Sequence, residues 1–227
     1  MSARLFLLSP ANCGGSRAQQ LLAARGTLPL ASRLQSPEGA PLGELFAYVS
    51  SLYFRGKLAY ATRFAQPPLV GDPIVGSGVH IITASSGLRP PEHRLGAADL
   101  KRLARVDIRA DNRQFAEPLR RSARGLLERV GSSAEVVLLG SVATPKYVDA
   151  LLEVFGQQLR FPIAFVGRGD MSRGGLLLRS AASGQELDYV PVEGAVRHGP
   201  RPPKLTPLGP CPFGDRPTQG GATRGTQ

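Results

Sequence analysis

Short apolar runs alternate with segments of helical periodicity along most of the chain. This alternation is typical of an α/β arrangement. Four apolar runs are expected to be buried strands: Leu5–Leu8, Val79–Ala84, Val136–Leu139 and Pro162–Val166. The pattern therefore predicts a single α/β domain with a mainly parallel or mixed sheet flanked by helices.

Two helices are predicted from apolar spacing and terminal signals. Apolar residues recur at helical intervals from Leu119 to Val130, and again over Val148–Phe155. The second helix has Thr144 as its expected cap, Pro145 in its first turn and Gly156 just past its end. Both helices should pack on the sheet.

Other segments predict a third helix, a hairpin and a tail. Leu42–Ala65 is expected to be helical, with a break at Gly56. Leu176–Leu178 and Leu187–Val190, separated by Ser-Gly, predict a C-terminal β-hairpin. Residues 199–227 are rich in proline and glycine, so we expect a disordered basic tail after a folded domain of residues 1–198.

Composition and charge indicate an anionic partner. The chain has 227 residues and a formal net charge of +11, of which +8 falls on residues 1–198. A nucleic acid or nucleotide is the expected partner, although an arginine-rich solvated surface is the simpler alternative. No apolar run is long enough to span a bilayer, so we expect no membrane partner and a cytoplasmic location.

Neither a metal nor a cofactor is expected. Cys13 and Cys211 are far apart in the chain, and the three histidines show no ligand spacing to them. The sequence does not indicate an oligomeric state.

A small, polar or glycine-containing loop follows each predicted strand. If the strands are parallel, all four loops open onto one edge of the sheet, where open α/β sheets bind ligands. The loops are residues 9–17, 85–90, 140–146 and 167–175.

The first and third loops suggest phosphate contacts. Glycines and a helix start near Ser16 would let residues 9–17 cradle an anion, or they form an ordinary strand-to-helix turn. Cys13 in this loop is a candidate reactive thiol. Lys146 lies near a predicted helix N-terminus, where it would meet a phosphate or remain a solvated lysine.

The fourth loop places two arginines around an aspartate among four glycines. Arg168 and Arg173 would approach a phosphate or carboxylate with little steric cover. Asp170 would orient an arginine, act as a base or simply cap a turn.

Taken together and in order, these loops resemble the peroxide stress protein YaaA family over roughly residues 5–180. The resembling segments are Leu7–Asn12, Leu52–Leu58, Ile82–Pro90, Gly140–Tyr147 and Gly167–Arg173. The resemblance implies an α/β core with a polar sheet edge, association with DNA and a link to oxidative stress.

The chain departs from that family at several positions. The lysine of the first family turn is Asn12 here, the tyrosine before Gly87 is Ser86, and a residue is missing before Leu88. The stretch that carries the family's helix-hairpin-helix is missing here, so the resemblance does not imply that this chain binds duplex DNA through that element.

Two functional hypotheses follow. The first is a DNA- or nucleotide-associated protein that binds phosphate. The second is an enzyme, hydrolase or glycosylase-like, in which Asn12 hydrogen-bonds a base and Asp170 activates water. The expected phosphate contacts are Ser9, Arg89, Lys146, Arg168, Ser172 and Arg173, and the expected pocket residues are Tyr53, Ser85, Ser86 and Gly87.

One geometric observation separates these hypotheses. Convergence of the polar loop residues in a closed pocket favours the enzyme, whereas arginines spread over a flat basic face favour DNA binding. The residues to follow are Asn12, Ser86, Lys146, Asp170 and Arg173.

Overall fold

The computed structural model describes residues 3–24 and 28–205, and its centre is a six-stranded mixed sheet. The strand order is β4-β3-β1-β6-β7-β8. The four inner strands are parallel, and β4 and β8 are antiparallel edge strands. The prediction of a single α/β domain is confirmed. The strands are β1 (Arg4–Leu8), β3 (Val79–Thr83), β4 (Gly87–Arg89), β6 (Glu135–Leu139), β7 (Leu159–Pro162) and β8 (Tyr189–Pro191).

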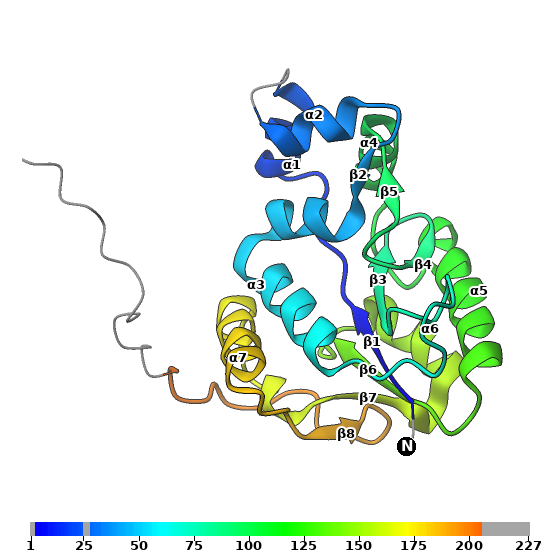
Figure 1. Ribbon diagram of the computed structural model, residues 1–227. Helices are drawn as coiled ribbons and strands as arrows, with labels where there is room; N and C mark the ends of the chain where they lie inside the picture. Colours follow the sequence, from blue (N-terminus) through cyan, green and yellow to red (C-terminus); the bar gives the residue numbers. More distant parts are fainter. Residues whose placement is uncertain (1–2, 25–27, 206–227) are drawn as a thin grey trace, which may run out of the picture.

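Helices cover both faces of this sheet (Figure 1). The helices α3 and α7 lie on one face, and α5 and α6 on the other. A two-residue antiparallel pair, β2 (Ala40–Pro41) with β5 (Arg94–Leu95), lies outside the main sheet. The helices are α1 (Ser16–Ala23), α2 (Pro29–Gln35), α3 (Leu42–Phe64), α4 (Ala97–Ala104), α5 (Arg113–Val130), α6 (Pro145–Phe155) and α7 (Asp170–Ser183).

The central strand β1 separates two hydrophobic clusters. Leu5 and Leu7 pack with residues of α5 and α6, while Phe6 and Leu8 pack with residues of α3 and α7. Side chains alternate between the two faces of a strand, so an uninterrupted apolar run is needed where both faces are covered. This explains why the strand reads as a continuous hydrophobic run.

A kink divides α3, and it lies before the predicted break. Ser51 has φ 53° and ψ −131°, whereas Gly56 is helical and buried. Gly56 instead permits close packing, because a Cβ there would lie 2.6 Å from the carbonyl oxygen of Gly174 in α7. The glycine is needed for contact between helices.

The predicted C-terminal hairpin is wrong. Leu176–Leu178 lies inside α7, and β8 pairs with β7 instead. Residues 170–175 of the predicted fourth loop are likewise the first turns of α7, so the loop shortens to residues 167–169. A run of leucines fits either element, and here the helix is favoured because it buries Leu177 against α3.

The other three predicted strands and the three predicted helices are confirmed with shifted bounds. The predicted strand Pro162–Val166 is wrong, because β7 shares only Pro162 with it and the next residues form a 3₁₀ turn, η2 (Ile163–Phe165). A second 3₁₀ turn, η1 (Gly156–Gln158), follows α6. Thr144 precedes α6 as expected, but its side chain makes no capping hydrogen bond.

The described part of the predicted tail lies against the body of the protein. Arg168 donates a hydrogen bond from Nη1 to the carbonyl oxygen of Pro203 over 3.4 Å. Residues 206–227, which include Cys211, lie outside the described residues.

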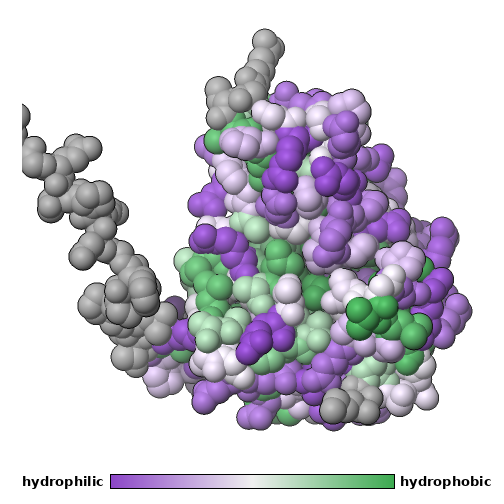
Figure 2. All heavy atoms as spheres, viewed as in Figure 1, coloured by the Kyte–Doolittle hydropathy of each residue, from purple (hydrophilic) through white to green (hydrophobic). Residues whose placement is uncertain are grey.

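Hydrophilic residues dominate the face shown in Figure 2, with hydrophobic residues gathered near its middle. Within residues 3–24 and 28–205, no helix is both long and apolar enough to cross a membrane.

Candidate functional site

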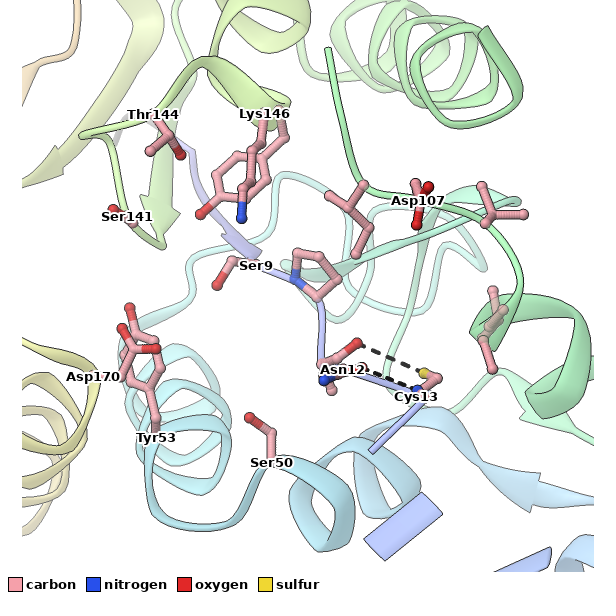
Figure 3. A pocket seen from close by; sticks show the side chains of 18 of the residues that line it. Ser9, Asn12, Cys13, Ser50, Tyr53, Asp107, Ser141, Thr144, Lys146 and Asp170 are labelled. Carbon is pink, nitrogen blue, oxygen red and sulfur yellow. Dashed lines mark hydrogen bonds between the residues drawn. The ribbon is translucent and has the colours of Figure 1, made fainter. Parts of the chain in front are cut away.

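A polar cavity of about 660 Å³ lies at the carboxyl ends of β1 and β6 (Figure 3). Its walls come from the β1–α1 loop, the middle of α3, the α4–α5 loop, the start of α6 and the first residue of α7. This is the sheet edge at which the sequence predicted a site. Five of the predicted site residues line it: Ser9, Asn12, Tyr53, Lys146 and Asp170.

The β1–α1 loop supplies two of these side chains. The backbone N–H of Ser9 donates to Leu139 of β6, which holds the loop to the sheet just past the end of β1. Asn12 is exposed, and its Oδ1 accepts a hydrogen bond from the Gly14 N–H at 3.0 Å. The NH₂ end of Asn12 is therefore the end that can donate to a ligand.

Lys57 of α3 is a buried amine in the cavity wall. Its side chain is only 1% exposed, and its Nζ lies 2.7 Å from the Ser9 carbonyl oxygen and 2.8 Å from Ser9 Oγ. The Tyr53 and Phe54 rings lie 4.5 and 4.8 Å from Nζ. Burial lowers the pKa of Lys57 to about 7, and the Asp170 carboxylate only partly opposes this effect.

Tyr147 of α6 places a phenol beside the same serine. Burial raises the pKa of Tyr147 to about 12, while hydrogen bonding with the Ser9 side chain and the Ser141 backbone acts in the opposite direction. Gly140 makes this approach possible, because a Cβ there would lie 2.7 Å from Tyr147 Oη and 2.8 Å from Ser9 Cβ. The phenol and the amine thus meet at one hydroxyl.

Tyr53 presents a buried hydroxyl without a partner. Its side chain is 7% exposed, and its Oη makes no hydrogen bond within the described residues. Burial raises the pKa of Tyr53, and the nearby Arg173 guanidinium opposes the shift. Arg173 is the polar neighbour of this hydroxyl, and a ligand or water in the cavity would complete its hydrogen bonding.

Two helix N-termini bring opposite charges to the cavity. Lys146 is exposed in the first turn of α6, and Asp170 is the first residue of α7. Figure 3 shows Lys146 and Thr144 at one side of the cavity, with Asn12 and Ser50 opposite. Asp107, from the α4–α5 loop, adds a second carboxylate. The N-terminal ends of helices favour anions, so the Lys146 side is the expected phosphate side.

Arg173 lies behind the cavity instead of lining it. Its Nε and Nη2 donate to the Phe165 carbonyl oxygen at 3.3 and 3.1 Å, and its Nη1 lies 3.5 Å from an Asp170 oxygen. Arg168 donates to Ala164 and Ser172. Both arginines thus bond to residues on either side of the β7–α7 connection and hold it together. Most of the loop that was expected there is the start of α7. Contacts of Arg168, Ser172 and Arg173 with phosphate stay predictions.

The loop after β3 does not reach the cavity. It turns back as β4, so Ser85, Ser86 and Gly87 belong to a tight reversal in which Gly87 has φ 69°. A Cβ on Gly87 would lie 2.3 Å from the Pro118 carbonyl oxygen of α5. Arg89 lines a separate hollow near α5. The expectation that all four loops meet is therefore wrong for this loop, since β4 is antiparallel.

Cys13 lines the cavity, but its thiol is shielded. The residue is 5% exposed, and burial raises its pKa to about 12. The thiolate is the reactive form of cysteine, so this environment disfavours Cys13 as a nucleophile.

Lys57 and Tyr147 are not among the site residues predicted from the sequence. Lys57 carried a recognisable signal, because it stands one helical turn after Tyr53 in an apolar helix, and lysine is rarely buried without a reason. Tyr147 carried none, because its position next to Ser9 depends on β1 and β6 being neighbours.

Among the described residues, no group of three or more His, Cys, Asp or Glu side chains is placed to hold a metal ion. Comparisons with protein-family models, curated proteins and solved structures find no match to this chain.

Proposed function

We propose that this protein is an enzyme that binds a nucleotide, free or as a unit of nucleic acid, in the cavity at the carboxyl edge of its sheet. The observation that carries the proposal is the convergence in a single cavity of polar side chains from the β1–α1 loop, α3, α6 and α7. They are Ser9, Asn12, Tyr53, Lys146 and Asp170. Of the five residues chosen to separate the two hypotheses, Asn12, Lys146 and Asp170 line the cavity, and Ser86 and Arg173 do not. A hollow of this kind, lined by polar side chains, is more than binding of a phosphate backbone requires.

The size and chemistry of the cavity support a nucleotide. Its volume of about 660 Å³ lies within the range common for small-molecule sites. Lys146 and the N-terminus of α6 would meet the phosphate. Asn12 and the carboxylates of Asp107 and Asp170 would hydrogen-bond base or sugar groups. Lys146 and the two carboxylates give the wall of the cavity charges of both signs, so the cavity suits a ligand with both anionic and hydrogen-bonding parts.

Calorimetric titration with nucleoside monophosphates, nucleosides and free bases tests this proposal. We expect saturable binding of a monophosphate, weakened about tenfold or more in Lys146→Ala because a charge-assisted contact is lost. Lys101→Ala, which removes an exposed lysine of α4 away from the cavity, is the matched control and should bind like the wild type. No saturable binding of any member of the three classes at millimolar concentration would overturn the proposal.

A second candidate is association with duplex DNA, which the net charge of +11 favours. In that case a duplex would bind without engaging the cavity. The link to oxidative stress rests on the resemblance to the YaaA family and stays a prediction.

A further inference from the structure

The floor of the cavity holds a serine whose hydroxyl contacts a buried amine. Ser9 Oγ lies 2.8 Å from Lys57 Nζ, and Figure 3 shows the Ser9 side chain directed into the open space between Tyr53 and Lys146. Ser9 follows β1 directly, and its carbonyl oxygen accepts a second bond from the same amine. Two contacts from one amine fix the serine and the lysine relative to each other.

Lys57 has no carboxylate partner within the described residues. No ion pair is formed by it there, and its contacts are Ser9 and the rings of Tyr53 and Phe54. Buried lysines are normally paired, and one that is not tends to lose its proton. A neutral amine at this position can donate to the Ser9 carbonyl and accept the proton of the Ser9 hydroxyl.

We propose that Ser9 is a nucleophile and Lys57 its general base, and that the pair attacks an ester group of the ligand in the cavity. A nucleophile and a base within hydrogen-bond reach, with a third group orienting them, are the requirements for covalent catalysis by serine. Here the Ser9 carbonyl oxygen holds the base, and Tyr147 holds the nucleophile, because its phenol lies against the Ser9 side chain.

With a carboxylic ester as the reactive group of the ligand, the reaction balances with water as the only co-reactant. Ser9 Oγ bonds to the carbonyl carbon of the ester while its proton passes to Lys57 Nζ. The carbon–oxygen bond to the alcohol then breaks, and Lys57 returns the proton to the leaving alcohol. Water, deprotonated by Lys57, next attacks the acyl group on Ser9. The carboxylic acid leaves, and the proton returns to Ser9.

The surroundings of Lys57 predict how the pair responds to pH. The Asp170 carboxylate of α7 acts on the amine, and the Tyr53 ring of its own helix lies against it. Tyr147 of α6 and Arg173 of α7 are the next groups out, since both act on Tyr53. Lys146 and Asp107 line the same cavity farther along its wall. Because burial lowers the pKa of Lys57 to about 7, the neutral base becomes the main form above that pH.

A fluorophosphonate probe tests the pair without a nucleotide. Attack of Ser9 Oγ on its phosphorus forms an O–P bond, breaks the P–F bond and releases fluoride, with the proton taken by Lys57. Intact mass and peptide mapping of the full chain should show one adduct on Ser9. Ser9→Ala should lose the adduct, and Lys57→Met should label at least tenfold more slowly. Ser32→Ala, which removes an exposed serine of α2 outside the cavity, should label like the wild type.

The labelling rate of the wild type should also rise with pH through about 7, which gives a readout even if Lys57→Met fails to fold. Failure of Ser9 to label at pH 8, or equal labelling of a folded Lys57→Met, would overturn the inference. The inference about Ser9 and Lys57 rests on the proposed role of the cavity as a substrate site. The experiments nevertheless distinguish failure of this inference from failure of the proposed function. Labelling of Ser9 without nucleotide binding contradicts only the nucleotide, and nucleotide binding without labelling contradicts only the serine chemistry.

Discussion

At the scale of single residues, the environment of Lys57 is the most consequential feature of the cavity. This residue is 1% exposed, and its amine has no carboxylate partner within the described residues. Its charged form is therefore destabilised, because removal of a charge from water is unfavourable. The folded state favours the neutral form of Lys57, so folding and protonation of this amine are linked.

This linkage predicts a pH dependence of stability. The pKa of Lys57 falls from 10.5 to about 7 on folding, so between these values the unfolded chain binds the extra proton. Stability therefore rises with pH from about 7 to 9, above which ionisation of Cys13 in the unfolded chain opposes it. In Lys57→Met we expect the rise in melting temperature between pH 7.5 and 8.5 to disappear, as measured by circular dichroism at these two pH values. This window lies above pH 6.5, near which the lowered pKa values of His80 and His93 also make stability rise with pH.

Lys146→Met is the matched control for that experiment. Its side chain is exposed at the start of α6, so its removal should leave the pH profile of stability as in the wild type. A Lys57→Met profile that rises as steeply as that of the wild type would contradict the lowered pKa of Lys57.

At the scale of elements, the contact between α3 and α7 positions one wall of the cavity. Gly56 and Gly174 let the two backbones approach, and this approach brings Asp170 toward Tyr53 and Lys57. Because the contact is between backbones, it has no flexible side chain that can yield to a larger residue.

We therefore expect Gly56→Ala to destabilise the protein by about 1–3 kcal/mol, the usual cost of overpacking. Its Cβ would meet the Gly174 carbonyl oxygen at 2.6 Å. Urea denaturation of the wild type and the variant measures the change. Gly125→Ala in α5 is the matched control, since no atom lies within 4 Å of its Cβ. That change should stabilise by about 0.5–1 kcal/mol through helix propensity. Equal effects of the two substitutions would show that the α3–α7 contact tolerates a methyl group.

At the scale of the whole molecule, positive charge and the cavity make separable contributions to binding. Ion pairs with carboxylates engage several surface arginines, for example Arg33, Arg113 and Arg124. Exposed pairs of this kind are weak and screened by salt. The formal net charge of +11 already counts the paired carboxylates, so the molecule as a whole stays strongly positive.

Duplex DNA should therefore bind through the general field, with an affinity that falls about tenfold or more between 50 and 200 mM salt. Fluorescence anisotropy of a labelled duplex measures this dependence. Lys146→Ala should change it only slightly, because one cation among many is lost, while the same variant loses nucleotide affinity. A duplex affinity that falls in parallel with nucleotide affinity in this variant would instead place the DNA contact at the cavity.

The sequence alone determined the layered α/β architecture and the edge of the sheet at which polar residues gather. The local spacing of apolar residues predicts buried strands and amphipathic helices. Parallel strands then place the loops that follow them at the same edge of the sheet. For this reason Ser9, Asn12, Lys146 and Asp170 were identified before the structure.

The tertiary structure decided which loops share the cavity and which buried groups touch. The direction of β4 removed Ser85 and Ser86 from the site, and the helical start of α7 tied Arg173 to Phe165. The contact of Lys57 with Ser9 joins positions 48 residues apart. Pairings of this kind depend on strand order and helix packing, which no local pattern encodes, so only the folded chain brings the serine, the lysine and the tyrosine together.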